Sequence, residues 1–171
     1  MKTTVQGATR AWADRRTFVL ATLVLFFAAT MAGVLAEQGL SDGPGPAFGP
    51  LQLRLTYNPG VSFGFGSALP AWLVTTITGA ITAGVAVYAW RAVPALAAMS
   101  RLGLAAILGG ALANLLDRAI DGVVTDYLHT GWFPTFNLPD VFITCGAVLL
   151  VAGTLWRPRG TREPRAPGGA G

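Results

Sequence analysis

The sequence is short of the side chains on which most covalent and metal-assisted catalysis depends. Among its 171 residues there is one cysteine, Cys145, one histidine, His129, and one lysine, Lys2. A single cysteine excludes a disulfide within the chain, and one cysteine with one histidine cannot form a tetrahedral zinc site. We expect Cys145 to be a small buried core residue of a helix, because free cysteine usually behaves as a buried hydrophobe.

Charge is also scarce. Charged residues make up 12% of the chain, about half of the roughly 25% typical of soluble domains. Hydrophobic residues make up 53%, and the mean hydropathy is +0.55, so much of the apolar surface is expected to face lipid. Four runs have about the length of a membrane helix: residues 17 to 36, 68 to 90, 102 to 116 and 138 to 156. The first is longer than the core of a signal peptide and three more follow it, which indicates an uncleaved helix.

The basic residues predict how these spans are oriented. Ten of the twelve Lys and Arg residues fall on one side of a four-span arrangement, which the positive-inside rule makes cytoplasmic. They are Lys2, Arg10, Arg15, Arg16, Arg91, Arg101, Arg157, Arg159, Arg162 and Arg165. Both termini are then cytoplasmic. Residues 1 to 16 form an N-terminal segment, residues 17 to 156 the membrane domain, and residues 157 to 171 a disordered basic tail.

The segments on the outer side have a different character. Residues 41 to 50 are rich in Gly and Pro, as in a loop. Residues 51 to 58 (LQLRLTYN) alternate apolar and polar side chains, which predicts a strand with one apolar face. We expect a small extracytoplasmic β segment over about residues 51 to 66, lying on the outer membrane surface.

Carboxylates are the remaining candidates for catalysis. The lone lysine lies on the cytoplasmic side, no serine stands in a nucleophile-elbow pattern, and there is no HExxH motif. Two carboxyl groups held close together share a proton, so that one acts as a base and the other as an acid. Asp140 follows Asn137, a suitable N-cap, at the start of the fourth span, so we expect it to ionise first. Its partner is Asp117, Asp121 or Asp126, and spacing alone does not choose among them.

Four motifs give the chain a family resemblance: NPGVSFG (58 to 64), GGALANLLDR (109 to 118), GVVTDYL (122 to 128) and FNLPD (136 to 140). In this order, they resemble those of the lipoprotein signal peptidases, or signal peptidase II, over residues 17 to 156. The resemblance implies a mainly α membrane protein with four transmembrane helices and a small extracytoplasmic β-cradle. It implies Asp126 and Asp140 as catalytic aspartates. The supporting or substrate-binding residues that it implies are Asn58, Asn114, Asp117, Arg118 and Asn137.

The resemblance also implies an activity and a location. The family comprises aspartic endopeptidases of the bacterial cell membrane that need no metal or cofactor. They cleave the signal peptide of diacylglyceryl-modified prolipoproteins just before the lipidated cysteine. The expected partners are therefore lipidated prolipoproteins and membrane lipid, not nucleic acid, and the expected state is a monomer.

This chain departs from the family at Pro139, where alanine is usual, at His129, and at Glu37-Gln38, the counterpart of a first-helix motif. The departures leave open a divergent paralogue. They also leave open a non-catalytic membrane protein that binds lipoproteins or lipid through the same groove. Simpler structural roles are open as well: helix capping for the aspartates, a turn for Asn58, and close helix packing for GGALA at residues 109 to 113.

Overall fold

The computed structural model describes residues 2 to 59 and 69 to 156, except for the side chains of residues 2 to 5. Within these residues, four helices are long and apolar enough to cross a membrane, as the sequence predicts. They are α1 (Lys2–Leu40), α2 (Ala71–Ala92), α3 (Ala98–Asp121) and α4 (Leu138–Leu155). The expected tail, and the part of the β segment over residues 60 to 66, lie outside the described residues.

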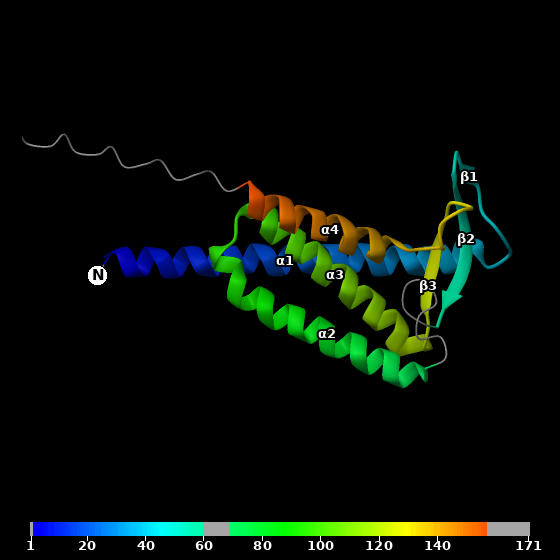
Figure 1. Cartoon of the computed structure of the whole chain (residues 1–171), viewed down its shortest axis with the longest axis horizontal. Helices are drawn as coiled ribbons and strands as arrows, with labels where there is room; N and C mark the ends of the chain where they lie inside the picture. The colour runs from blue at the N-terminus through cyan, green and yellow to red at the C-terminus, as the bar shows by residue number, and fades with distance from the viewer. Residues whose placement is uncertain (1, 60–68, 157–171) are drawn as a thin grey trace, which may run out of the picture.

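Two helices differ in extent from the sequence prediction. The first has 39 residues and a length of about 58 Å, nearly twice the roughly 30 Å of a bilayer core, and it projects beyond the other helices (Figure 1). The start of the third helix was placed wrongly: α3 begins at Ala98, so Arg101 lies inside it. The guanidinium of Arg101 forms a salt bridge with Asp14 of α1, and this pairing allows the charge to remain within the helix.

Glycines allow α3 to lie against α1 and α4. A Cβ atom on Gly109 would be 3.0 Å from the carbonyl oxygen of Thr22 in α1, and one on Gly110 would be 2.5 Å from that of Pro139 in α4. Further along, a Cβ on Gly146 would be 2.5 Å from the carbonyl oxygen of Gly103. The close-packing interpretation of GGALA is therefore confirmed, and α3 is the central helix of the bundle.

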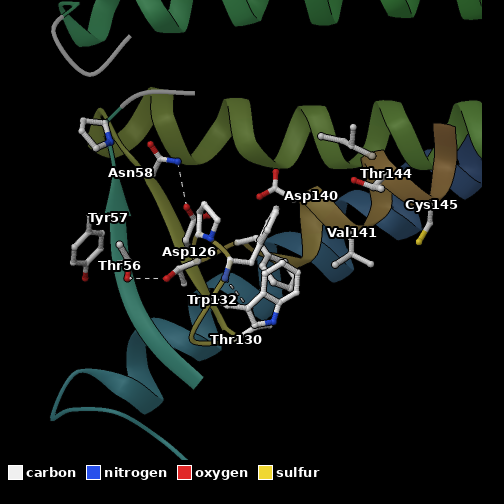
Figure 2. A pocket seen from close by; sticks show the side chains of 16 residues that line it. Thr56, Tyr57, Asn58, Asp126, Thr130, Trp132, Asp140, Val141, Thr144 and Cys145 are labelled. Atoms are coloured by element: carbon white, nitrogen blue, oxygen red, sulfur yellow. Dashed lines mark hydrogen bonds between the residues drawn. The ribbon is translucent and has the colours of Figure 1, made fainter. Parts of the chain in front are cut away.

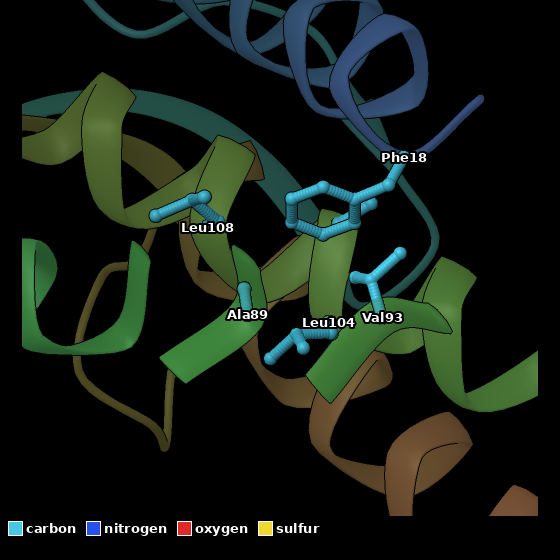
Figure 3. Close-up of a cluster of buried hydrophobic side chains, with 6 residues drawn as sticks. Phe18, Ala89, Val93, Leu104 and Leu108 are labelled. Carbon is cyan, nitrogen blue, oxygen red and sulfur yellow. The ribbon is translucent and has the colours of Figure 1, made fainter. Parts of the chain in front are cut away.

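Buried apolar side chains of α1, α2, α3 and the turn between α2 and α3 pack together (Figure 3). The 3-10 turn η2 (Val93–Ala95) connects α2 to α3 there. The cluster consists of Phe18, Ala89, Val93, Leu104, Ala105 and Leu108. The N-terminus of α1 and the C-terminal end of α4 point towards the same end, whereas the strands lie at the other (Figure 1).

The strands form one antiparallel sheet in the order β1-β2-β3: β1 (Ala47–Phe48), β2 (Leu51–Asn58) and β3 (Val124–His129). The prediction of a strand over residues 51 to 58 is confirmed. The short β1 lies in the segment expected to be a loop, and β3 was not predicted. Gly122, in the left-handed region at φ 75°, ends α3 and turns the chain directly into β3.

Candidate active site

Asp126 enters the site from the middle of β3. It is only 3% exposed, and in the sheet it lies opposite Thr56 of β2. Two residues further along β2, on the same face, Asn58 donates a hydrogen bond from Nδ2 to Asp126 Oδ2 at 3.3 Å. The other carboxyl oxygen, Oδ1, is buried and has no hydrogen-bond partner among the described residues. Asn58 therefore does more than serve the turn before Pro59.

Asp140 enters the site from the first turn of α4. Asn137 is the N-cap of this helix, as predicted, and its side chain accepts a hydrogen bond from Asp140 N at 2.9 Å. In return, Asn137 N donates to Asp140 Oδ2 at 3.4 Å, which completes a capping box. Pro139 lies in the first turn, where a helix needs no backbone N–H donor. The departure at Pro139 is therefore compatible with this helix start.

Asn114 of α3 forms hydrogen bonds with both Asp140 and the N-cap residue Asn137. It donates from Nδ2 to Asp140 Oδ1 at 3.0 Å, and its Oδ1 accepts from Asn137 Nδ2 at 3.0 Å. The Asn137 amide, only 2% exposed, also donates to the carbonyl oxygen of Thr125 at 3.4 Å. A chain of amide groups thus runs from Asp140 to the backbone of β3, one residue before Asp126.

Asp117 and Arg118 lie one helical turn beyond Asn114. Asp117 Oδ2 accepts a hydrogen bond from the backbone N–H of Thr125 at 2.7 Å. Arg118 is buried and lies close enough to Asp117, Asp126 and Asp140 to interact electrostatically with all three carboxyl groups. The structure therefore gathers all seven residues named by the family resemblance at one end of α3.

The two carboxyl groups border the same open space. A cavity of about 970 Å³ is lined by both, together with β2, the loop before α4 and one face of α4 (Figure 2). A second cavity, of about 230 Å³, is also lined by Asp126 and Asp140, with Asn58, Asn114 and Arg118 beside them. Asp121, in contrast, is exposed at the end of α3 and lines neither of these cavities.

Burial changes the acidity of Asp126. It raises the pKa of this carboxyl group to about 7, and the negative charge of nearby Asp140 adds to the effect. The hydrogen bond from Asn58 and the positive charge of Arg118 act in the opposite direction but are outweighed. At neutral pH, Asp126 therefore carries its proton for a large part of the time.

One residue differs from the expectation drawn from sequence, and two others had no expected structural role. Cys145 is not a core residue: it is exposed on α4 and forms part of the wall of the larger cavity. His129 ends β3, and its Nδ1 lies 3.1 Å from Thr135 Oγ1. Thr125 was missed altogether, although its hydroxyl donates to Glu37 Oε1 at 3.0 Å. Its only signal was its position beside Asp126.

Comparisons with known proteins agree with this geometry. The sequence pattern of the family described as signal peptidase (SPase) II matches residues 20–156. The chain belongs to the signal peptidase II family. It is thus an aspartic-type lipoprotein signal peptidase and a multi-pass membrane protein, and the predicted fold and activity class are confirmed.

Three bacterial relatives show the similarity. A lipoprotein signal peptidase of Burkholderia vietnamiensis is 46% identical over 116 residues, covering 64% of this chain and 69% of the relative. One from Rhizorhabdus wittichii is 39% identical over 141 residues, covering 78% and 76%. One from Rhodococcus jostii is 38% identical over 127 residues, covering 66% of this chain but 59% of the relative's own length.

Solved structures share the fold. Two chains described as bacterial membrane enzymes superpose with TM-scores of 0.71 and 0.66, each at 21% identity. The matches cover 88% and 83% of this signal peptidase and 94% of each solved chain.

Proposed function

We propose that this protein cleaves the signal peptide of diacylglyceryl-modified prolipoproteins just before the lipidated cysteine, with Asp126 and Asp140 as the catalytic pair. One observation carries the proposal: two carboxyl groups, from β3 and α4, line the same cavities. In addition, the pKa of one of them is raised to about 7, so that a pair with a single proton can exist at neutral pH.

Asp140 is the base of the proposed pair. It accepts hydrogen bonds from Asn114 Nδ2 and from the backbone N–H of Asn137, and both bonds favour the charged carboxylate. Its place in the first turn of α4 adds the positive end of the helix dipole. In this role Asp140 takes a proton from the attacking water.

Asp126 is the acid. Its buried carboxyl group holds the proton, with one oxygen bonded to Asn58 and the other without a partner among the described residues. In this role it donates a hydrogen bond to the oxygen of the scissile carbonyl group. That oxygen gains negative charge as water attacks, so the donor stabilises the transition state more than the ground state.

The proposed reaction balances without a cofactor. A water oxygen forms a bond to the carbonyl carbon, its proton passes to Asp140, and the carbonyl oxygen takes the proton of Asp126. When the tetrahedral intermediate collapses, the C–N bond breaks, Asp140 gives its proton to the leaving amine, and Asp126 recovers its own. The products are a carboxylic acid and an amine, the new N-terminus of the lipidated cysteine.

The other hydrogen bonds and charges of the site have supporting roles in the proposal. Asn114 and Asn137 orient Asp140, and Asn58 orients Asp126. Asp117 holds the backbone of β3, and Arg118 provides a positive charge beside all three carboxyl groups.

The walls of the larger cavity suit a lipidated substrate. They include the apolar side chains of Trp132, Phe133, Phe136, Val141 and Ile143, and the first two form an edge-to-face pair with ring centroids 5.6 Å apart. We infer that acyl chains pack against this surface while the peptide bond lies at the carboxyl groups. A monomer is sufficient, because both carboxyl groups and their hydrogen-bond partners belong to one chain.

The proposed orientation places the catalytic pair on the extracytoplasmic face and both termini in the cytoplasm. In support, the start of α1, the α2–α3 connection and the end of α4 lie at one end of the bundle, opposite the sheet (Figure 1). Exposed Arg10, Arg16 and Arg91 lie on segments at that end. In this arrangement residues 17 to 156 form the peptidase domain, and residues 1 to 16 and 157 to 171 are cytoplasmic.

The test uses the purified chain in detergent with a diacylglyceryl-modified precursor. We expect Asp126→Asn and Asp140→Asn each to abolish cleavage, whereas Asp121→Asn, which alters an exposed carboxylate outside both cavities, leaves the rate unchanged. Cleavage by either of the first two variants would disprove the catalytic pair.

A further inference from the structure

Thr125 is held by three different helices. Its backbone N–H donates to Asp117 Oδ2 of α3 at 2.7 Å, and its hydroxyl donates to Glu37 Oε1 of α1 at 3.0 Å. Its carbonyl oxygen accepts from Asn137 Nδ2, at the N-cap of α4, at 3.4 Å. Thr125 is only 4% exposed. All three polar groups of this buried residue are therefore bonded, each to a different part of the bundle.

The position of Thr125 in β3 links these bonds to the catalytic pair. The side chains of successive strand residues point to opposite faces of the sheet. The Thr125 side chain therefore points towards the helices, whereas the Asp126 side chain lies on the same face as Asn58 and points into the cavities. A shift of Thr125 along or across the strand would move Asp126 with it. Asp140 is connected to the Thr125 carbonyl group through the hydrogen bonds of Asn114 and Asn137. The positions of both catalytic carboxyl groups therefore depend on the position of Thr125.

The bond between Thr125 and Glu37 is separable from the other two. A valine at this position has the same shape as threonine and suits a strand, and it would keep both backbone hydrogen bonds. Only the contact with α1 would be lost. Neither Thr125 nor Glu37 lines either of the two cavities that the described residues form around the carboxyl groups, so neither is placed to touch substrate there.

We propose that Thr125 and Glu37 are positioning residues that hold Asp126 in register with Asp140, through the hydrogen bond between the Thr125 hydroxyl and the Glu37 carboxylate. The proposal rests on the catalytic pair proposed above. It gives a function to Glu37, at the point where the first helix departs from the family pattern. In this proposal α1, which carries neither Asp126 nor Asp140, contributes to the geometry of the active site through Glu37.

The experiment compares kcat, KM and the pH profile of the full chain with a diacylglyceryl-modified precursor in detergent. We expect Thr125→Val to lower kcat roughly tenfold to a hundredfold with KM unchanged, because small displacements of a catalytic group have effects of this size. We also expect the alkaline limb of its pH profile to move. Thr125→Ser keeps the hydroxyl donor and Glu37→Gln keeps an oxygen acceptor, so each of these variants should retain most of the wild-type rate.

Glu37→Leu removes the same bond from the other side and should match Thr125→Val, and the double variant should be no worse than either alone. Thr22→Val is the matched control, because Thr22 is also buried and its hydroxyl, among the described residues, bonds to the Phe18 carbonyl of its own helix. It should keep the wild-type kcat and pH profile.

Wild-type kcat and pH profile in a folded Thr125→Val variant would overturn the positioning role, as would additive effects in the double variant. Failure of both single variants to fold would also overturn it, because the bond would then be needed for folding itself. The catalytic pair is tested separately: if Asp126→Asn still cleaves, the proposed function fails whatever Thr125→Val does.

Discussion

Asn114 of α3 donates a hydrogen bond to Asp140 of α4, with 3.0 Å between Nδ2 and Oδ1. The same side chain accepts a hydrogen bond from Asn137, the cap of α4. A single amide of the central helix therefore orients the proposed base and steadies the start of the helix that carries it. Because α3 also packs closely on α1 at Gly109, the hydrogen bond from Asn114 fixes the position of Asp140 relative to both α3 and α1.

Replacing Asn114 by alanine should lower kcat by roughly tenfold to a hundredfold. Hydrogen bonds to charged groups contribute about 1.5–3 kcal/mol, and Asn137 would in addition lose an acceptor for its buried amide. Cleavage of a lipidated precursor measures the effect, with Gln6→Ala, an exposed amide in α1, as the control. A wild-type rate in folded Asn114→Ala would show that Asp140 does not depend on this bond.

The rate should depend on the protonation of Asp126. Because its pKa is raised to about 7 and the proposed acid is the protonated form, kcat should be high below this pH and fall as pH rises through it. The same shift affects stability: its favourable contribution is complete below the ordinary pKa of 3.8 and is lost as pH rises through about 7. A rate that increases through pH 7 would reverse the assignment of acid and base.

Asn58→Leu should move the alkaline limb of that profile to higher pH. The Asn58 hydrogen bond lowers the pKa of Asp126, so its removal raises that pKa further. Thr56→Val is the paired control, because the Thr56 hydroxyl bonds to Thr135 instead of Asp126. An alkaline limb that stays in place in Asn58→Leu would mean that another group controls it.

Gly146→Ala should destabilise the bundle by roughly 1–3 kcal/mol, the usual effect of overpacking. The added methyl group would stand 2.5 Å from the carbonyl oxygen of Gly103 and 2.9 Å from Ile107 N, both backbone atoms. Gly84→Ala in α2 meets nothing within 4 Å and should be neutral or stabilising by up to about 1 kcal/mol. Thermal unfolding in detergent compares them, and equal melting temperatures would contradict the close contact.

A bulky thiol reagent should inhibit the enzyme through Cys145. The thiol is exposed and forms part of the cavity wall, so an attached group would occupy space proposed for the acyl chains. The measurement is cleavage before and after treatment with a maleimide. Cys145→Ala should show no change on treatment, and inhibition that persists in this variant would place the reagent elsewhere.

Local patterns were sufficient for much of the fold. The apolar runs predicted four helices, alternation predicted β2, and the Asn137–Asp140 spacing predicted the cap of α4. Each of these signals lies within a few consecutive residues, because helix capping and strand alternation depend on near neighbours. The boundary at Arg101 was wrong because its partner, Asp14, is far away in the sequence.

The sequence alone determined the membrane class, the four helices, and carboxylates as the available catalytic groups, because composition and short-range patterns specify these. It did not choose the partner of Asp140 except through the family resemblance. Tertiary structure decided which carboxyl groups share a cavity, and it showed that Thr125 is hydrogen-bonded to residues of α1 and α3 and to the N-cap of α4. These features depend on contacts between Glu37, Asn58, Thr125 and Asn137, residues that only folding brings together.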